Sequence, residues 1–235
     1  MPLARRPSDT APRCSAVTRA LQVPLRALRA YLETLAESFE DGDARGDQAA
    51  GALQEVKRLE RSVLLLVEYE EEPQLMPLRC TMDELARGAR ASLPERDRDR
   101  IWIAHEARDR QLVVDGPLLT RCLTRLMENA LQAGSDRVLL RIRREAGFSV
   151  FSVVDRAPDS GFELDRAGQP FRSTRLGQLG LGLTLAVRDV ELMGGTLHAE
   201  RTPLGDTCMH LAVPDADVAA AREAWCDTDA AEGAA

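Results

Sequence analysis

The chain has 235 residues, of which 44% are hydrophobic and 29% charged, and its net charge is −7. This composition excludes a disordered chain, and the length suffices for one large or two modest domains with a buried core. The acidic total argues against a protein that binds nucleic acid.

The N-terminal segment and the cysteines indicate where the protein works. Residues 1–14 carry three prolines, lack the apolar core of a signal peptide and are expected to form a loose arm. The longest apolar run, SVLLLV at 62–67, is too short to span a bilayer. Five cysteines are scattered singly, without CxxC or paired histidines, which is poor evidence for zinc or disulfides and favours reduced thiols. We therefore expect a soluble, cytoplasmic protein without a membrane partner.

The first predicted domain, residues 15–72, is an antiparallel helical hairpin. Apolar residues recur at helical spacing over residues 15–40 and again over 48–70, and the polar turn EDGDARGD separates the two runs. The pair has more apolar surface than two helices can bury. We therefore expect two copies to form a dimeric four-helix bundle, and packing on the rest of the same chain is the alternative.

A second domain is predicted over residues 78–214, after the proline-containing boundary EEEPQLMPL. Its helical and strand patterns alternate, and the strands are predicted to form an antiparallel layer covered by helices, an α+β sandwich. The predicted helices span 80–93, 116–134 and 180–195, and the predicted strands lie within 101–106, 111–115, 136–157 and 196–214. Residues 215–235 are expected to form a tail with one short helix.

Four motifs follow one another in this second domain. They are Glu128–Asn129 near a helix end, Asp155 at a strand end, PFRSTR at 170–175, and GLGL at 180–183 opening a helix. In this order they resemble the nucleotide-binding domain of bacterial sensor histidine kinases, whose GHKL or Bergerat fold is shared with the gyrase, Hsp90 and MutL ATPases. Each motif alone has an ordinary structural explanation, but their order and spacing favour the resemblance.

The resemblance implies a site for ATP and Mg²⁺. Asn129 would ligate Mg²⁺ through its side-chain oxygen, and Glu128 beside it could act through a metal-bound water, because Mg²⁺ prefers hard oxygen ligands. Asp155 would accept a hydrogen bond from the amino group of adenine.

The phosphates would be held by the later motifs. Gly180 and Gly182 would present backbone N–H groups at a helix N-terminus, where anions are favoured. Thr174 and Arg175 would stand near the terminal phosphate.

Three departures from the family pattern predict a weakened ATP site. The family's DxGxG loop reads DRAPDSG here, so an alanine and Asp159 replace both glycines. Arg125 takes the place of the family's first helix asparagine. Gln178 takes that of the first glycine of the GxGLGL box, unless Gly177 compensates through a shift of one residue.

The hairpin resembles the family's dimerisation and phosphotransfer domain around Pro24. The family signature S-H-E-x-x-T-P-L, laid on TRALQVPL at 18–25, matches at Pro24 and Leu25, and the family's proline kinks this helix. The phosphoacceptor histidine falls on Arg19, the adjacent acid on Ala20, and the residue for phosphatase activity on Val23.

These replacements remove the chemistry of the hairpin. Arginine stays protonated in proteins and cannot be the nucleophile, whereas a neutral imidazole can. The three histidines, His105, His198 and His210, all lie in predicted strands of the second domain.

The sequence thus predicts a pseudo-histidine kinase, which acts in two-component signalling by protein–protein interaction and has no autokinase or phosphatase activity. Its docking surface would comprise Arg19, Val23, Pro24 and Arg26, and its partner would be a response-regulator receiver domain or another kinase. A homodimer through the hairpin is expected, although the sequence leaves a mixed dimer open.

The main alternative is an ATP-dependent kinase that phosphorylates a partner's histidine or serine through the retained site. A phosphorelay protein would need a hairpin histidine and is nearly excluded. A structural protein without either partner is the remaining possibility.

Overall fold

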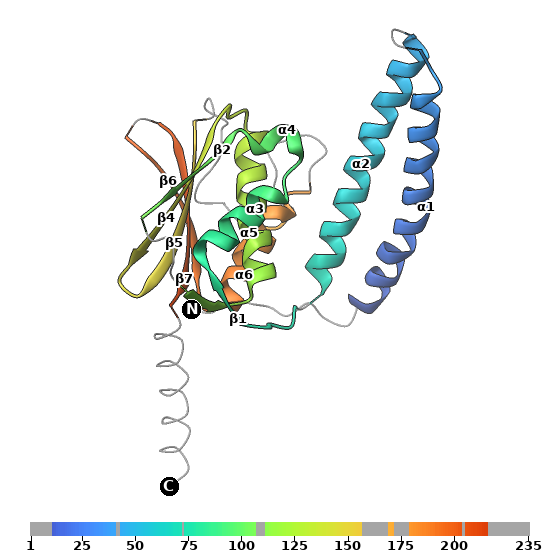
Figure 1. The fold of residues 1–235 in the computed structure, drawn as a ribbon. Coiled ribbons are helices and arrows are strands. Elements are labelled where there is room, and N and C mark those ends of the chain that lie inside the picture. The colour runs from blue at the N-terminus through green and yellow to red at the C-terminus, as the bar shows by residue number, and fades with distance from the viewer. Residues whose placement is uncertain are drawn as a thin grey trace. The chain divides into compact units, whose positions relative to one another are not determined.

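The computed structural model divides the chain into two compact units, Met1–Glu72 with Phe171–Leu181, and Pro73–Pro170 with Gly182–Ala235 (Figure 1). The structure describes residues 11–40, 43–71, 73–106, 111–156, 169–171, 179–203 and 205–215, without the side chains of residues 11–16. The predicted tail beyond residue 215 and most of the predicted N-terminal arm lie outside these residues. Among the described helices, none combines the length and the apolar composition that crossing a bilayer requires.

The first unit contains the predicted pair of helices, α1 (Ala11–Glu37) and α2 (Ala44–Glu70). Helix α1 begins four residues before the predicted start, because Pro12 lies in the first turn, where a proline displaces no helical hydrogen bond. Pro24 lies inside the same helix, as predicted. Helix α2 begins at the cap residue Asp43, whose side chain accepts a hydrogen bond from the backbone N–H of Arg45.

The hairpin buries only a narrow part of its apolar surface. Ala49, Val56 and Val63, spaced seven residues apart on α2, are buried, and ion pairs Arg29–Glu60 at 3.6 Å and Lys57–Glu33 at 3.5 Å join the two helices. Many larger apolar side chains remain exposed: Val17, Leu21, Val23, Leu28, Tyr31, Leu35, Leu59, Leu64 and Tyr69.

The second unit is built around a sheet with the strand order β2-β4-β5-β7-β6, and a separate pair joins β1 and β3. Its strands are β1 (Leu78–Thr81), β2 (Ile101–His105), β3 (Gln111–Val114), β4 (Val138–Glu145), β5 (Phe148–Asp155), β6 (Thr196–Arg201) and β7 (Thr207–Pro214). Its helices are α3 (Met82–Ala91), α4 (Glu95–Arg98), α5 (Gly116–Gln132) and α6 (Leu181–Leu192).

The prediction of an antiparallel layer is wrong for one strand, β2. Strands β4, β5, β7 and β6 pair antiparallel, but β2 pairs with β4 in parallel. Between β2 and β4 the chain passes through β3 and α5, and a crossover of this length returns the chain in the same direction. Strands β2 and β3, adjacent in sequence, do not pair with each other, since β3 pairs with β1.

Alternation along the strands separates a core face from an outer face. Phe151 and Val153 of β5 and Leu211 and Val213 of β7 belong to the core, to which α3, α5 and α6 contribute their apolar faces. These helices cover one face of the sheet (Figure 1). The residues between them on β5 and β7, such as Ser152, therefore point to the opposite face.

The turn predicted at Ala146–Gly147 is confirmed. Both residues have positive φ, 49° and 84°, and they join β4 to β5 in a two-residue hairpin. Positive φ at both central positions matches the right-handed twist of the paired strands.

The Gly195→Ala substitution is expected to lower the free energy of unfolding of the second unit by roughly 1–3 kcal/mol, as overpacking does. A Cβ at this position would lie 2.3 Å from the backbone oxygen of Ala212 in β7 and 3.0 Å from Val190 Cγ1. Urea unfolding followed by circular dichroism measures the effect. Gly88→Ala is the matched control, because its Cβ would meet Thr120 at an ordinary 3.6 Å. Equal stability of the two variants would contradict the prediction.

Candidate functional site

Asn129 and Glu128 lie on the last turns of α5, outside the apolar face of that helix. The helix begins at the cap residue Asp115, whose carboxylate accepts hydrogen bonds from the backbone N–H groups of Leu118 and Met76, each at 2.9 Å. Its apolar face enters the core, while Asn129 and Glu128 are half-buried. This cap and this packing fix the position of both polar side chains.

Asp155 ends the central strand β5. Its Cα pairs with Val138 of β4 on one side and with Thr207 of β7 on the other, and the residue is 6% exposed. A carboxylate placed in this way is held by the sheet itself. Helix α5 packs against β5, so the elements that carry Asn129 and Asp155 are in contact.

The GLGL segment opens α6, as predicted. Gly180 has φ 65° and precedes the helix, which begins at Leu181. A Cβ built on Gly182 meets no described residue within 4 Å, so packing against the described part of the chain does not require a glycine there. The backbone at Gly182 is therefore open to a close approach by another molecule.

The remaining predicted residues of the site lie outside the described part of the chain. These are Thr174 and Arg175, together with Asp159 and Gln178 of the departures. Phe171 of the PFRSTR motif is described within the first unit, where its ring meets Tyr69 edge-on at 5.7 Å.

Residues 114–217 match the family of histidine kinase-, DNA gyrase B- and HSP90-like ATPases. This segment is similar to the ATPase domains of that family, and the second unit is called the ATPase domain after it. It contains α5, β5 and the GLGL segment.

Solved structures of histidine kinases share the fold. Full-length ShkA in complex with AMPPNP has a TM-score of 0.65 at 17% identity, over 88% of this chain and 46% of ShkA. ThkA in complex with the response regulator TrrA has a TM-score of 0.60 at 18% identity, over 85% of this chain and 60% of the ThkA chain. AdeS of Acinetobacter baumannii has a TM-score of 0.57 at 13% identity, over 84% of this chain and 98% of the AdeS chain.

These likenesses show the fold alone and confirm a helical hairpin followed by a GHKL ATPase domain with a mixed sheet. The chain spans less than half the length of ShkA. A comparison with curated protein sequences finds no match.

Arg125 of the ATPase domain joins α5 to α6. Its guanidinium lies 3.1 Å from Asp189, a fully buried carboxylate that also pairs with Arg121 at 3.3 Å and Arg188 at 2.8 Å. Sequence reasoning placed Arg125 at the family's asparagine position but missed this cluster. The spacing Arg121–Arg125, one helical turn, was the available signal, although it does not identify the carboxylate.

The four predicted docking residues on α1 are all exposed. Val23 is 72% exposed, and Pro24 and Arg26 are also exposed. Arg19, at the place of the phosphoacceptor, donates a hydrogen bond from Nη2 to Glu71 Oε1 at 2.5 Å. The Arg19 side chain is thus ion-paired within the hairpin unit.

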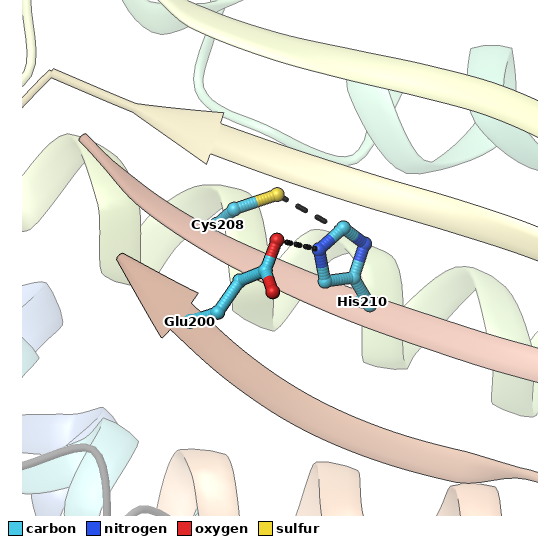
Figure 2. Close-up of side chains that lie close together, drawn as sticks. All are labelled: Glu200, Cys208 and His210. Carbon is cyan, nitrogen blue, oxygen red and sulfur yellow. Dashed lines mark hydrogen bonds and ion pairs between the residues drawn. The ribbon is translucent and has the colours of Figure 1, made fainter. Parts of the chain in front are cut away.

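Two cysteines of the ATPase domain have thiols that resist ionisation. Burial, with the charge of Asp189, raises the pKa of Cys122 to about 12. Burial and then Glu200 raise the pKa of Cys208 above its ordinary value. Cys208 lies beside Glu200 and His210 on the outer face of the sheet (Figure 2). Sequence reasoning missed this group because it considered each cysteine and each histidine alone.

Proposed function

We propose that the chain is a pseudo-histidine kinase of two-component signalling, which binds other proteins and does not phosphorylate itself on histidine. The observation that carries the proposal is Arg19. The family signature aligns Arg19 with the phosphoacceptor histidine. Its guanidinium pairs with Glu71, and residues 15–72 contain no histidine. A phosphoacceptor needs a nitrogen lone pair, which a guanidinium does not offer at any working pH.

The exposed surface of α1 supports a docking role. Arg19, Val23 and Arg26 follow at steps of four and three residues, which places them on one face of the helix. Beside them is a groove of about 400 Å³ in the hairpin, lined by Gln22, Leu25, Arg26, Arg29, Glu60, Val63 and Leu64. The two arginines favour an acidic partner surface. ThkA, similar in fold, has been seen in complex with a response regulator, so the proposed partner is a receiver domain.

The same hairpin is proposed to form a homodimer. Its exposed apolar side chains, such as Leu21 and Leu28 at 46% and 48%, would be buried by a second hairpin in a four-helix bundle. Light scattering on the purified chain measures the mass directly. A monomer at tens of micromolar would contradict the dimer and leave the docking proposal standing.

The ATPase domain has polar groups and an open backbone position that fit a nucleotide with Mg²⁺. Asp155 offers a carboxylate fixed at the end of β5, Asn129 offers an amide oxygen on α5, and Gly182 leaves space at the N-terminus of α6. In the proposed site Asp155 would hold the adenine, Asn129 with Glu128 the metal, and Gly180 and Gly182 the phosphates, near Thr174 and Arg175. ShkA, similar in fold, binds AMPPNP.

An ATP-dependent kinase acting on a partner's histidine or serine is the second candidate, favoured by these same residues. ATP would supply the phosphoryl group, and the chain's own residues would bind and orient it. Phosphoryl transfer depends chiefly on such positioning and on charge stabilisation.

Radiolabelled ATP distinguishes the two candidates. We expect the full chain, incubated with labelled ATP and Mg²⁺, to acquire no acid-labile phosphate. A phosphohistidine on this chain, located by mass spectrometry, would overturn the proposal. Label transferred to an added hairpin domain of a histidine kinase, and lost with Asn129→Ala, would establish the second candidate.

Docking has a separate test. A panel of purified receiver domains from the host genome, titrated by calorimetry, is expected to include one that binds. Val23→Asp should weaken that binding at least tenfold. Leu78→Asp is the matched control, because Leu78 is 66% exposed in the other unit. Equal weakening by both variants, or no binding by any receiver domain, would contradict docking through α1.

A further inference from the structure

Strands β6 and β7 bring four polar side chains together on the outer face of the sheet. In the antiparallel register His198 lies opposite His210, and Glu200 lies opposite Cys208. Residues two apart on a strand share a face, so the four occupy one block of two neighbouring pairs. The rings of His198 and His210 stack with centroids 4.9 Å apart.

The ligating atoms of three of these residues converge (Figure 2). His210 Nε2 lies 3.0 Å from Glu200 Oε1, and Cys208 Sγ lies 3.9 Å from His210 Nδ1. One ligating atom from each of Glu200, Cys208 and His210 falls within a mutual distance of 4.8 Å. Ligands of a tetrahedral Zn²⁺, at about 2.0–2.3 Å from the metal, are roughly 3.3–3.8 Å from one another. Small side-chain shifts therefore suffice to enclose an ion.

The environment of His210 is that of a metal ligand. Ser152 Oγ lies 2.8 Å from His210 Nδ1, and this hydroxyl can accept the Nδ1–H. That tautomer leaves a lone pair on Nε2, which faces Glu200. A second hydrogen bond that fixes the ring in this way is typical of histidines that bind metals.

The three residues Glu200, Cys208 and His210 differ in burial, and only the side of Glu200 is open to solvent. Cys208 and His210 are 4% and 7% exposed, whereas Glu200 lies at the surface. An ion can enter past Glu200 and displace its contact with Nε2. The contacts from Ser152 through His210 to Glu200 also resemble the serine–histidine–acid triad of hydrolases. Ser152 is only 1% exposed, however, so no substrate can reach its hydroxyl.

We propose that Glu200, Cys208 and His210 bind one Zn²⁺ ion on the outer face of the ATPase domain, with water in the fourth position. A mixed set of thiolate, imidazole and carboxylate ligands suits Zn²⁺. The ion would link β6 to β7, which carry Glu200 and the pair Cys208 and His210.

Cobalt titration of the metal-free full chain tests the site. Co²⁺ bound to a thiolate gives a charge-transfer absorption, and we expect one equivalent of Co²⁺ to produce it and Zn²⁺ to displace it. Cys208→Ser should abolish the band, and Glu200→Gln should weaken Co²⁺ binding at least tenfold. Glu200 is at the surface, so this variant keeps the fold even where Cys208→Ser does not.

The controls use a cysteine and a histidine elsewhere in the same domain. Cys80→Ser and His105→Asn, the latter at a histidine paired with Asp83 at 3.0 Å, should leave the band and the affinity unchanged. Zn²⁺ should also raise the melting temperature of the unchanged chain but not that of Glu200→Gln. Absence of a thiolate band, or a band that survives Cys208→Ser, would overturn the proposal.

Discussion

The Asp189→Ala substitution is expected to lower the free energy of unfolding of the ATPase domain by about 3–5 kcal/mol, the loss typical when one partner of a buried ion pair is removed. Asp189 is fully buried between α5 and α6. Without it the guanidinium of Arg125, whose side chain is 9% exposed, loses its compensating charge. Urea unfolding of the full chain, followed by circular dichroism, measures the change.

Two further variants show whether charge compensation is the cause. Arg188→Ala should cost about 1 kcal/mol or less, because Arg188 is 26% exposed and its contact is screened. Asp189→Leu combined with Arg125→Met should recover most of the stability, since it removes both buried charges at similar volume. A loss below 1 kcal/mol for Asp189→Ala would contradict the prediction.

The helices and most strands were predictable because their signals are local. The periodicity of residues 15–40 and 48–70 fixes two helices, and Ala146–Gly147 fixes a tight hairpin, since few residues adopt positive φ. The order of the motifs around Asn129, Asp155 and the GLGL segment then pointed to a histidine-kinase-like fold.

What the sequence did not predict depends on contacts between distant segments. The parallel partner of β2 lies beyond β3 and α5, and no local pattern specifies it. Arg125 and Asp189 are 64 residues apart, so the ion pair follows from how α5 and α6 pack. Glu200 and His210 become neighbours only in the register of β6 and β7, although His-x-Glu and Cys-x-His were visible in the sequence.

Phosphotransfer by the hairpin and nucleotide binding by the ATPase domain would depend on different residues of this molecule. The hairpin has Pro24 inside α1, and Arg19, which the family signature aligns with the phosphoacceptor, is ion-paired with Glu71. In the ATPase domain Asn129 lies on α5 and Asp155 ends β5, while Arg125 is ion-paired with the buried Asp189. Nucleotide binding therefore has to be tested apart from phosphotransfer.

The Gly182→Ala substitution is expected to weaken binding of MgATP at least tenfold without lowering the stability of the domain. A Cβ there meets no atom of the described residues within 4 Å, and alanine favours a helix more than glycine does by about 1 kcal/mol. The new methyl group would instead occupy the space through which a phosphate approaches the N–H groups at the start of α6. Calorimetry with and without Mg²⁺ measures the affinity, and urea unfolding measures the stability.

Asn129→Ala and Gly88→Ala are the reference variants for this comparison. Asn129→Ala should reduce ATP binding only in the presence of Mg²⁺, because the amide oxygen acts through the metal. Gly88→Ala, on α3, should leave the ATP affinity unchanged and should not lower the stability. Unchanged ATP affinity in Gly182→Ala would refute the site at α6. Absence of binding to the unchanged chain at millimolar ATP would mean that the DRAPDSG segment has closed the pocket, which leaves the protein a binding partner alone.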